Sequence, residues 1–483
     1  MKAGATHDLY IYDEEFRDNI ATVDSKGKRI WIYPKKPTGT MHNWRIVVTV
    51  VLLGLFFGGP LLKIGGRPFM LLNFFERRFV IFGQAFWPQD FVLLAITLIT
   101  FFVFIILFTV VFGRVWCGWM CPQTLFMEMV FRKIEYWIEG DAPAQRRLDQ
   151  APLSLSKAVK KTSKHIIFIA ISLLISHTVM AYLIGIEGTV RIVQQSPAEN
   201  PAGFIGLVVF TAIFYGVYAR FREQACIAAC PYGRLQGVLL GRDSIVVAYD
   251  WLRGEPRGRL QKKTPEAITP GGDCIDCKLC VHVCPTGIDI RHGTQLECVN
   301  CTACVDACDD VMVKINKPKG LIRLASYNAI QNGIQKIFSG RVIGYSLVLV
   351  ALMGVLAFTL TTRSDIETTI LKVPGTLYQR TPEGYITNLY NVELINKTFD
   401  PQTIEVRALS PEGAELQRAD GKSLEIPAEG MIKGVFFIRI PSDQVKNART
   451  VVEVGIFRNG ELLETAKVKF IGPVSKSSDM RRR

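Results

Sequence analysis

The sequence predicts a polytopic α-helical membrane protein with about five spans, a cysteine-rich insert and a C-terminal antiparallel β-sandwich. Three observations predict this fold class: five long apolar runs, eight cysteines at regular spacing between the last two runs, and a final stretch of alternating, β-branched residues. Hydrophobic residues make up 49% of the 483-residue chain, which suits a membrane protein with polar domains better than a soluble enzyme.

Five stretches are long and apolar enough to cross about 30 Å of hydrocarbon as helices. They cover residues 44–64, 90–112, 165–185, 203–219 and 341–361. Residues 1–40 are polar and charged, so we expect no cleavable signal peptide, and the first span serves as anchor. Residues 66–89 are aromatic and interrupted by Gly and Pro, which predicts an interfacial or re-entrant segment, or a loop packed on the spans.

The basic residues around the spans predict a cytoplasmic N-terminus. They are frequent before the first span, between the second and third, and after the fourth, whereas the loop between the third and fourth carries only Arg191. The loop between the first two spans is less clear, with Lys63, Arg67, Arg77 and Arg78. By the positive-inside rule, residues 220–340 are cytoplasmic and the chain after residue 361 is periplasmic. These clusters account for the net charge of +14, and no basic, aromatic-rich stripe favours nucleic-acid binding.

Eight cysteines between the fourth and fifth spans form two equal groups. Each group has the spacing C-x2-C-x2-C-x3-C, with Cys274, Cys277, Cys280 and Cys284 in the first and Cys298, Cys301, Cys304 and Cys308 in the second. This is the spacing of bacterial two-cluster ferredoxins, in which the fourth cysteine of each run binds the other cluster. We therefore predict one 4Fe–4S cluster on Cys274, Cys277, Cys280 and Cys308, and a second on Cys298, Cys301, Cys304 and Cys284. Two clusters in one small fold predict an electron relay.

Other roles fit these eight cysteines less well. Disulfides are disfavoured on a reducing cytoplasmic side, and zinc usually takes two separated C-x2-C pairs. The sequence departs from the ferredoxin pattern at Asp309, which follows Cys308 where a proline is usual. Asp309 and Asp310 add negative charge, which we expect to make one cluster modestly harder to reduce.

Two further cysteine pairs directly follow the second and fourth spans. "CGWMCP" contains Cys117 and Cys121, and "CIAACP" contains Cys226 and Cys230. On a helix, residues four apart share one face with Cβ atoms about 5–6 Å apart, which permits a shared soft metal or, with adjustment, a disulfide. The repeated pattern predicts an internal duplication that brings both pairs together, and four thiolates suit Cu(I). A redox-active disulfide and simple packing of small apolar side chains stay open as alternatives.

The sequence does not identify an electron donor. No G-x-G-x-x-G fingerprint follows a predicted strand, so electrons from NAD(P)H or a flavin would have to come through a partner protein. A membrane haem needs facing histidines, and His42, His165 and His177 form no convincing pair. We expect His282 and His292, which flank the cluster cysteines, to be surface residues.

The C-terminal region predicts a small immunoglobulin-like β-sandwich at residues 364–475. Alternating runs such as "IEVRALS" and "TVVEVGIF" are separated by Pro, Gly, Asp and Asn turns. This region has no cysteine and no catalytic constellation, so we expect it to dock a partner outside the membrane. The predicted domains are therefore a cytoplasmic segment at 1–43, a membrane domain at 44–240, a cytoplasmic bacterial-type ferredoxin insert with two 4Fe–4S clusters at 241–340, the fifth span at 341–361, and the sandwich.

The whole pattern resembles the FixG/RdxA/CcoG family. The resemblance covers nearly the entire chain and is carried by "WCGWMCPQT", "CPYGR", "CIDCKLCVHVCPTGIDIR" and "CTACVDACDDVM". That family consists of multi-pass proteins of the bacterial inner membrane that are needed to assemble the cbb-type haem–copper oxidase. The resemblance implies reduction of Cu(II) to Cu(I) for the copper site of the oxidase. The residues that match its membrane-edge motifs, and would bind copper, are Cys117, Cys121, Cys226 and Cys230.

Three functions follow from these observations. The first is an enzyme, a cupric reductase whose partners are the membrane, oxidase assembly factors or copper-handling proteins, and an unidentified electron donor. The second is a quinol-linked electron-transfer protein similar to the NapH membrane ferredoxins, with no metal substrate; the outer sandwich counts against it. The third is a non-enzymatic iron–sulfur sensor or assembly scaffold. A homodimer stays open, since the sequence does not fix the oligomeric state.

Overall fold

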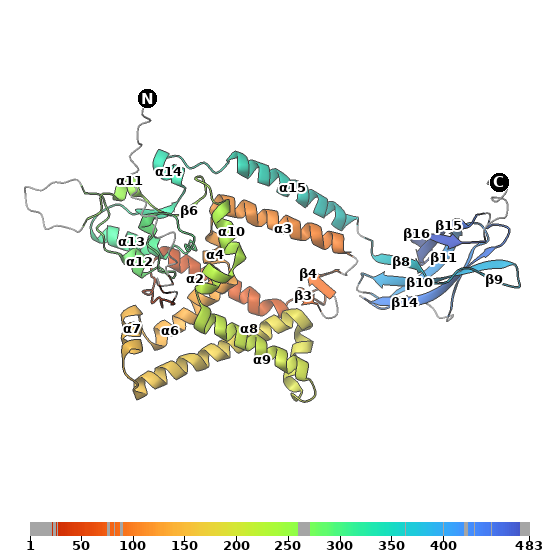
Figure 1. Ribbon diagram of the computed structural model, residues 1–483, viewed down its shortest axis with the longest axis horizontal. Helices are drawn as coiled ribbons and strands as arrows, with labels where there is room; N and C mark the ends of the chain where they lie inside the picture. The colour runs from red at the N-terminus through yellow and green to blue at the C-terminus, as the bar shows by residue number, and fades with distance from the viewer. Residues whose placement is uncertain are drawn as a thin grey trace, which may run out of the picture. The chain divides into compact units, whose positions relative to one another are not determined.

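The computed structural model describes residues 22, 26, 28–74, 78–81, 83–86, 90–258, 271–362, 364–398, 400–419, 424–428, 430–445 and 447–473. These residues form two compact units (Figure 1). The first contains the cysteine-rich domain and most of the apolar helices, and the second contains the C-terminal sandwich with residues 84–93. Most of the predicted segment 1–43, Arg77 and the end of the predicted sandwich lie outside the described residues.

Five helices among the described residues are long and apolar enough to cross a membrane, one for each predicted span. They are α2 (Thr40–Gly58), α3 (Phe91–Phe112), α8 (Leu155–Gln194), α9 (Pro201–Gly216) and α15 (Gly340–Thr361). The longest, α8, begins ten residues before the predicted span because Ser154 caps it by accepting from the Lys157 amide. Good helix formers such as lysine and alanine then carry the helix up to the apolar run.

The aromatic segment 66–89 contains strands, which the prediction of an interfacial or re-entrant loop did not include. Strands β1 (Lys63–Ile64) and β2 (Arg67–Pro68) pair as a hairpin. The turn is Gly65–Gly66, and both glycines have positive φ, as tight hairpin turns require. Three more strands follow, namely β3 (Met70–Asn73), β4 (Arg78–Ile81) and β5 (Gln84–Phe86). Glycine turns at short intervals leave no room for a helix here.

Short helices follow the second and fourth spans, where the proline of each C-x3-C-P motif begins a helix. After α3 come α4 (Val115–Trp119), α5 (Pro122–Phe126), the π-helix η3 (Met127–Phe131) and α6 (Arg132–Ile138). After α9 come the π-helices η4 (Val217–Phe221) and η5 (Ala225–Ala229), then α10 (Pro231–Leu239). Pro122 and Pro231 occupy the first helical position, where the missing amide hydrogen costs nothing.

The cysteine-rich domain is built around two short helices and one strand pair. The helices are α12 (Leu279–His282) and α13 (Ala303–Lys314), and β6 (Val246–Tyr249) pairs antiparallel with β7 (Ile322–Ala325). Buried Val247, Tyr249, Met312 and Leu321 form its core together with two of the cysteines. The apolar core therefore surrounds cysteines, which places their thiols away from water.

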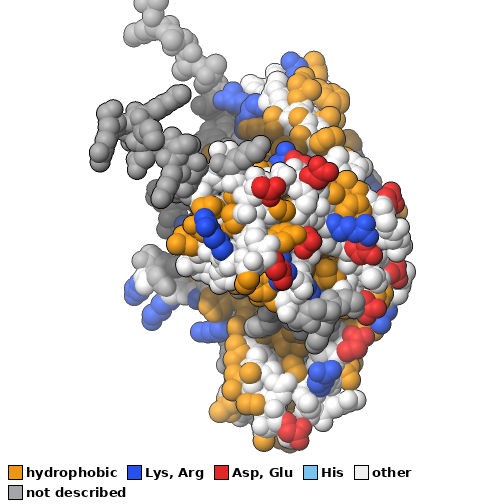
Figure 2. All heavy atoms as spheres, turned by 90° about the vertical axis from the view of Figure 1, so that its right-hand side faces the viewer, with side chains coloured by type: hydrophobic (Ala, Val, Ile, Leu, Met, Phe, Trp, Pro, Cys, Tyr) orange, Lys and Arg blue, Asp and Glu red, His pale blue; other side chains and the backbone are white. Residues whose placement is uncertain are grey.

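The C-terminal unit is a sandwich of two antiparallel sheets, with strand orders β12-β14-β10-β8 and β13-β11-β15-β16. The strands are β8 (Ile366–Lys372), β9 (Gln379–Arg380), β10 (Tyr385–Asn396), β11 (Gln402–Ser410), β12 (Glu415–Arg418), β13 (Glu425–Ile426), β14 (Met431–Pro441), β15 (Arg449–Arg458) and β16 (Glu461–Ile471). Ile386, Tyr390, Ile438, Val454 and Phe470 are among the side chains buried between the sheets. Figure 2 shows acidic and basic side chains interspersed on the face of the sandwich turned to the viewer.

Candidate iron–sulfur and thiol sites

The eight cysteines of the two runs line two cavities in the cysteine-rich domain. The first encloses about 350 Å³ of empty space and is lined by Cys284, Cys298, Cys301 and Cys304, together with Cys280, which also lines the second. The second encloses about 360 Å³ and is lined by Cys274, Cys277, Cys280 and Cys308. The structure therefore brings together the same two sets of four cysteines that the spacing assigns to two clusters. The remaining walls are largely apolar and include Val247 and Ile290 at the first cavity and Tyr249 and Met312 at the second.

The backbone around the two cavities repeats the same unusual conformation. Asp276 and Lys278 in the first cysteine run have positive φ, and so do Asn300 and Thr302 at the equivalent positions of the second. Left-handed residues other than glycine persist only where the surrounding structure imposes them. Alternation of right- and left-handed residues turns successive amide groups toward one concave site, which suits anions and iron–sulfur clusters. The repeated backbone shows that the two cysteine runs fold alike.

Four of the cavity thiols are poorly suited to ionise by themselves. Burial is the main cause that raises the pKa of Cys280, Cys298 and Cys308 to about 12, and of Cys301 to about 11. Such thiols become thiolates only when a bound metal supplies compensating positive charge. Soft sulfur donors in two apolar cavities of equal size fit two 4Fe–4S clusters. Asp309 contributes to the raised pKa of Cys308, so its negative charge lies near the second cavity. A lower reduction potential for a cluster bound there stays a prediction.

The two membrane-edge pairs, Cys117 with Cys121 and Cys226 with Cys230, lie close together. Burial is the main cause that raises the pKa of Cys226 to about 12, and Cys121, Cys117 and Cys230 all add to this effect. Cys226 also lies 3.9 Å from the Thr124 hydroxyl, on the helix that follows Cys121. The structure therefore gathers the four thiols in one region, although the described residues contain no three Cys, His, Asp or Glu side chains within reach of one metal ion.

The cysteines of each pair do not share a helix face, contrary to the helical geometry considered from the sequence. Cys117 lies in α4, but Cys121 has extended backbone and caps α5. In the same way Cys226 lies in η5, and Cys230 is the extended N-cap of α10. The proline after each second cysteine favours an extended conformation in the residue before it, which ends the preceding helix. The two motifs therefore have the same helix–cap–helix geometry.

The first membrane-edge motif packs directly on the ferredoxin-like domain. Cys117 contacts a buried group made of Val283, Val299, Cys301, Ala303 and Ala307. Next to it, a Cβ atom on Gly118 would lie only 2.4 Å from the Val299 carbonyl oxygen, so only glycine permits this approach. The thiol of one site is therefore packed against a wall of the first cavity.

A second link joins the first span to the same domain. Helix α2 has no side-chain cap of its own, because its N-cap residue is Gly39. The amides of Met41 and His42 instead donate to the two carboxylate oxygens of Asp306, in α13, at 3.0 and 2.8 Å. A carboxylate at a helix N-terminus also compensates the positive end of the helix dipole. This contact holds the domain against the beginning of α2.

Comparisons with known proteins agree with these features. The family profile for a 4Fe-4S dicluster domain matches residues 221–327, and that for a 4Fe-4S binding domain matches residues 94–140. The profile for the Ig-like fold at the C-terminus of FixG, an oxidoreductase family, matches residues 356–473. The predicted ferredoxin insert and immunoglobulin-like domain are confirmed.

Known relatives cover most of the chain. Protein RdxB from Cereibacter sphaeroides is 34% identical over 79% of this chain and 83% of RdxB. Nitrogen fixation protein FixG from Rhizobium meliloti is 32% identical over 83% of this chain and 84% of FixG. Protein RdxA from C. sphaeroides is 32% identical over 87% of this chain and 91% of RdxA. The chain belongs to the FixG/RdxA family. It is an iron–sulfur membrane protein of the oxidoreductase type.

One residue that the sequence did not single out connects the two sites of this FixG-family chain. Arg114 is only 4% exposed, and its Nε donates to Gln236 Oε1 at 2.6 Å. The Cys117 thiol donates to the same oxygen at 3.4 Å. The positive charge of Arg114 opposes the effect of burial on the pKa of both Cys117 and Cys298. A single buried guanidinium therefore favours negative charge in the first cavity and at the membrane-edge thiols.

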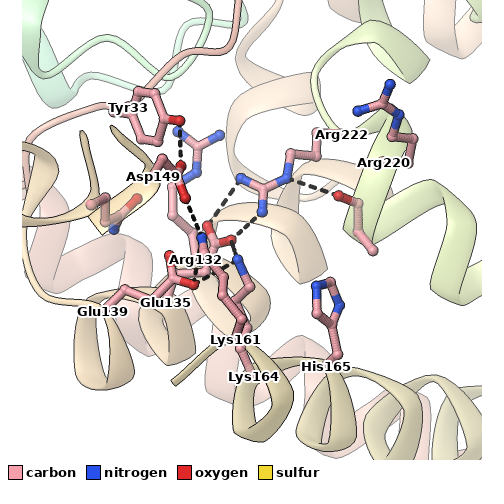
Figure 3. Close-up of polar contacts among 12 residues, drawn as sticks. Tyr33, Arg132, Glu135, Glu139, Asp149, Lys161, Lys164, His165, Arg220 and Arg222 are labelled. Atoms are coloured by element: carbon pink, nitrogen blue, oxygen red, sulfur yellow. Dashed lines mark hydrogen bonds and ion pairs between the residues drawn. The ribbon is translucent and has the colours of Figure 1, made fainter. Parts of the chain in front are cut away.

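A buried ion-pair network joins the helices that follow the second span to α8 and to the segment after η4 (Figure 3). Glu135 of α6 accepts from two guanidinium nitrogens of Arg222, and Lys164 of α8 lies 3.4 Å from Glu135 and 2.8 Å from Glu139. These four side chains are at most 8% exposed. Burial raises the pKa of Glu135, but Arg222, Lys164 and Arg132 outweigh it and lower the pKa below its usual value. The network therefore stays ionised inside the protein.

The network also fastens the segment that precedes the first span. The Tyr33 hydroxyl donates to Asp149, which is part of the network (Figure 3). The guanidinium groups of Arg29 and Arg222 each lie over the Trp31 ring, 4.4 Å from its centre. From the sequence, these basic residues could be interpreted only as signals of topology, because their partners lie far away in the chain.

The histidines considered for haem have other partners. His165 is hydrogen-bonded to the Tyr215 hydroxyl, and His177 is hydrogen-bonded to the Leu173 carbonyl oxygen.

The close contact at Gly118 gives a first prediction. Gly118→Ala is expected to lower the free energy of unfolding by about 1–3 kcal/mol, because the new methyl group overlaps the Val299–Asn300 backbone. Thermal unfolding of the purified protein measures this. The control is Gly54→Ala in α2, where a Cβ atom meets nothing within 4 Å. Equal melting temperatures for the two variants would show that the motif does not pack on the domain as described.

Proposed function

We propose that this chain is a cupric reductase, in which electrons from the two clusters reduce Cu(II) to Cu(I) at the four membrane-edge thiols. The observation that carries this proposal is the packing of Cys117 on the buried group that contains Cys301. It puts a candidate copper-binding thiol against the wall of a cluster cavity. The product would supply the copper site of a cbb-type oxidase.

The eight cysteines of the ferredoxin-like domain act as cluster ligands in this proposal. Cys274, Cys277, Cys280 and Cys308 would hold one cluster, and Cys298, Cys301, Cys304 and Cys284 would hold the other, which agrees with the lining of the two cavities. A bound 4Fe–4S cluster would supply one-electron transfer at each site. Arg114 favours added negative charge at Cys298 and so assists entry of an electron on the side nearest Cys117.

The membrane-edge cysteines bind the substrate ion. Thiolates are soft ligands and favour Cu(I) over Cu(II), so binding and reduction reinforce each other. Each Cu(II) takes up one electron, which the reduced clusters would supply, and no atom is transferred to or from the clusters. Protons leave the thiols when the metal binds, since only the thiolate is a good ligand. All four thiols are half-buried, so an ion bound there would be partly shielded from water.

The sidedness and partners are part of the same proposal. The basic residues favour a bacterial inner-membrane protein with the N-terminus and ferredoxin-like domain in the cytoplasm and the sandwich in the periplasm. The sandwich would then dock oxidase assembly factors or copper-handling proteins. The electron donor is a separate cytoplasmic protein, and two copies of the chain could associate as a homodimer.

One observation supports a second candidate function. The profile for a 4Fe-4S binding domain spans residues 94–140 and so includes Cys117 and Cys121. A further cluster on the membrane-edge thiols would make the chain a purely electron-transferring, quinol-linked protein without a metal substrate. The two candidates differ in iron content and in whether copper is consumed.

The test of the proposed function is anaerobic mixing of the dithionite-reduced protein with Cu(II). We expect the visible absorption of the oxidised clusters to return while Cu(I) appears in equal amount, trapped by bathocuproine. Zn(II) is the control, because it binds thiolates but accepts no electron. Reoxidation of the clusters by quinone, with no Cu(I) formed from Cu(II), would support the second candidate instead.

A further inference from the structure

A cavity separate from the cysteine sites lies where two membrane-spanning helices end. Its walls come from the last turns of α3, the loop after α10 and the first turn of α15 (Figure 1). It has about 750 Å³ of space, including solvent at its open side, and its lining includes Val110, Val111, Arg242, Asp243, Arg341 and Val342. The cavity therefore opens at the level of a membrane surface.

Two arginines give this cavity its charge. Arg341 Nη1 lies 3.5 Å from the position of a Cβ atom on Gly241, the residue before Arg242. Arg341 donates to the Leu239 carbonyl oxygen at 3.4 Å, and Arg242 lies over the Tyr327 ring at 5.5 Å. Within the described part of the chain, neither guanidinium forms an ion pair with a carboxylate. Both can therefore bind an anion.

The other polar groups of the cavity are already engaged. Asp243 accepts from the Asn328 amide at 2.7 Å, so its carboxylate points to a neutral partner rather than to either arginine. Ser244 Oγ donates to the Val110 carbonyl oxygen at 2.6 Å. The Ile245 amide donates to the Val111 carbonyl oxygen at 2.8 Å. These bonds satisfy the free carbonyl groups at the end of α3 and fix the cavity wall. The net charge that remains is positive.

Apolar side chains surround the polar part of the cavity. Val110, Val111 and Val342 belong to membrane-spanning helices, and they line the cavity together with Ile337. Ile337 is 45% exposed, and its neighbours Ile334 and Phe338 are 61% and 82% exposed. Exposed apolar groups beside paired arginines at a membrane surface match a ligand with an anionic head and apolar chains.

We propose that this cavity binds the phosphate of an anionic phospholipid, with Arg242 and Arg341 as its ligands. The acyl chains of the lipid then lie along the apolar ends of α3 and α15. The positive end of the α15 dipole adds to the attraction, since Gly340 and Arg341 begin that helix at the cavity. The lipid would join α15 to the loop that closes α3.

Native mass spectrometry of the purified full chain tests this proposal. With phosphatidylglycerol and phosphatidylethanolamine added in equal amounts, we expect one phosphatidylglycerol to be retained preferentially. The double variant Arg242→Gln/Arg341→Gln is expected to lose about 25-fold in affinity for phosphatidylglycerol, at roughly a factor of five for each arginine. The matched control is Arg146→Gln/Arg147→Gln, which removes the same charge from two exposed residues of α7 (Ala142–Gln150).

The arms of this experiment separate the outcomes. Retention by wild type and the α7 control, but not by the cavity variant, supports the proposal. Equal loss of phosphatidylglycerol from both variants would mean that the lipid is attracted nonspecifically to basic surface charge, and this result would overturn the proposal. Displacement of the lipid by millimolar inorganic phosphate would also overturn it, because the site would then recognise a free anion. Unchanged visible absorption of the clusters shows that the variants are folded.

Discussion

Replacing Cys226 and Cys230 with serine is expected to abolish Cu(II) reduction while both clusters remain. Serine keeps the size of each side chain but removes the soft sulfur that stabilises Cu(I). We expect the rate of Cu(I) formation to fall by more than about 100-fold, since changes even in the second shell of a metal site cost 10- to 100-fold. EPR spectra of the reduced protein should be unchanged, because these residues do not line either cluster cavity.

The same assay shows whether the two pairs form one site. If they do, Cys117→Ser/Cys121→Ser lowers the rate of Cu(I) formation by a similar factor. The variant that lacks all four cysteines is then no slower than either double variant, because residues that act as a unit give non-additive effects. The neighbour Thr124→Val, which keeps every thiol, serves as the control. Undiminished Cu(I) formation without Cys226 and Cys230 would refute the assignment of these thiols.

Glu135→Gln is expected to cause the largest loss of stability. The substitution removes the carboxylate that Arg222 and Lys164 share, and it leaves both cations buried without full compensation. Breaking a buried pair in this way costs about 3–5 kcal/mol. The change in the midpoint of thermal unfolding of the purified protein measures this cost.

An exposed ion pair provides the matched control. Glu187 of α8 lies 3.4 Å from Lys63 and is 76% exposed, so Glu187→Gln is expected to change stability by less than about 1 kcal/mol. If Glu135→Gln were no more damaging than Glu187→Gln, the network would be solvated rather than buried. The account of how residues 29–33 are held would then be wrong.

Much of the fold follows from local patterns in the sequence. The five spans depend on hydropathy alone, and the sandwich on alternation and turn residues, so both could be predicted without tertiary contacts. The grouping of the eight cysteines follows from spacing, because the fourth cysteine of each run binds the other cluster. Helix ends were less predictable, as α8 shows: Ser154 and good helix formers extend it well beyond the apolar run.

What the sequence could not predict depends on contacts between distant residues. The basic residues near the spans indicate topology, yet Lys164 and Arg222 are buried in ion pairs with residues 29 and 87 positions away. The role of Arg114 depends on Gln236, which lies 122 residues further along the chain. Likewise the extended backbone at Cys121 and Cys230 ends each preceding helix. The i,i+4 spacing therefore does not place the two cysteines of a pair on one helix face. None of these features has a periodic or compositional signal.

Metal analysis with EPR on purified wild type, beside the variant in which Cys117, Cys121, Cys226 and Cys230 are all serine, tests the central claim most directly. Two clusters of four iron atoms predict about eight iron atoms per chain in both proteins, with identical cluster spectra. After anaerobic loading, copper is expected to remain bound only to wild type, as EPR-silent Cu(I). About twelve iron atoms in wild type, falling to about eight in the variant, would contradict the account, because a third cluster would then occupy the four thiols.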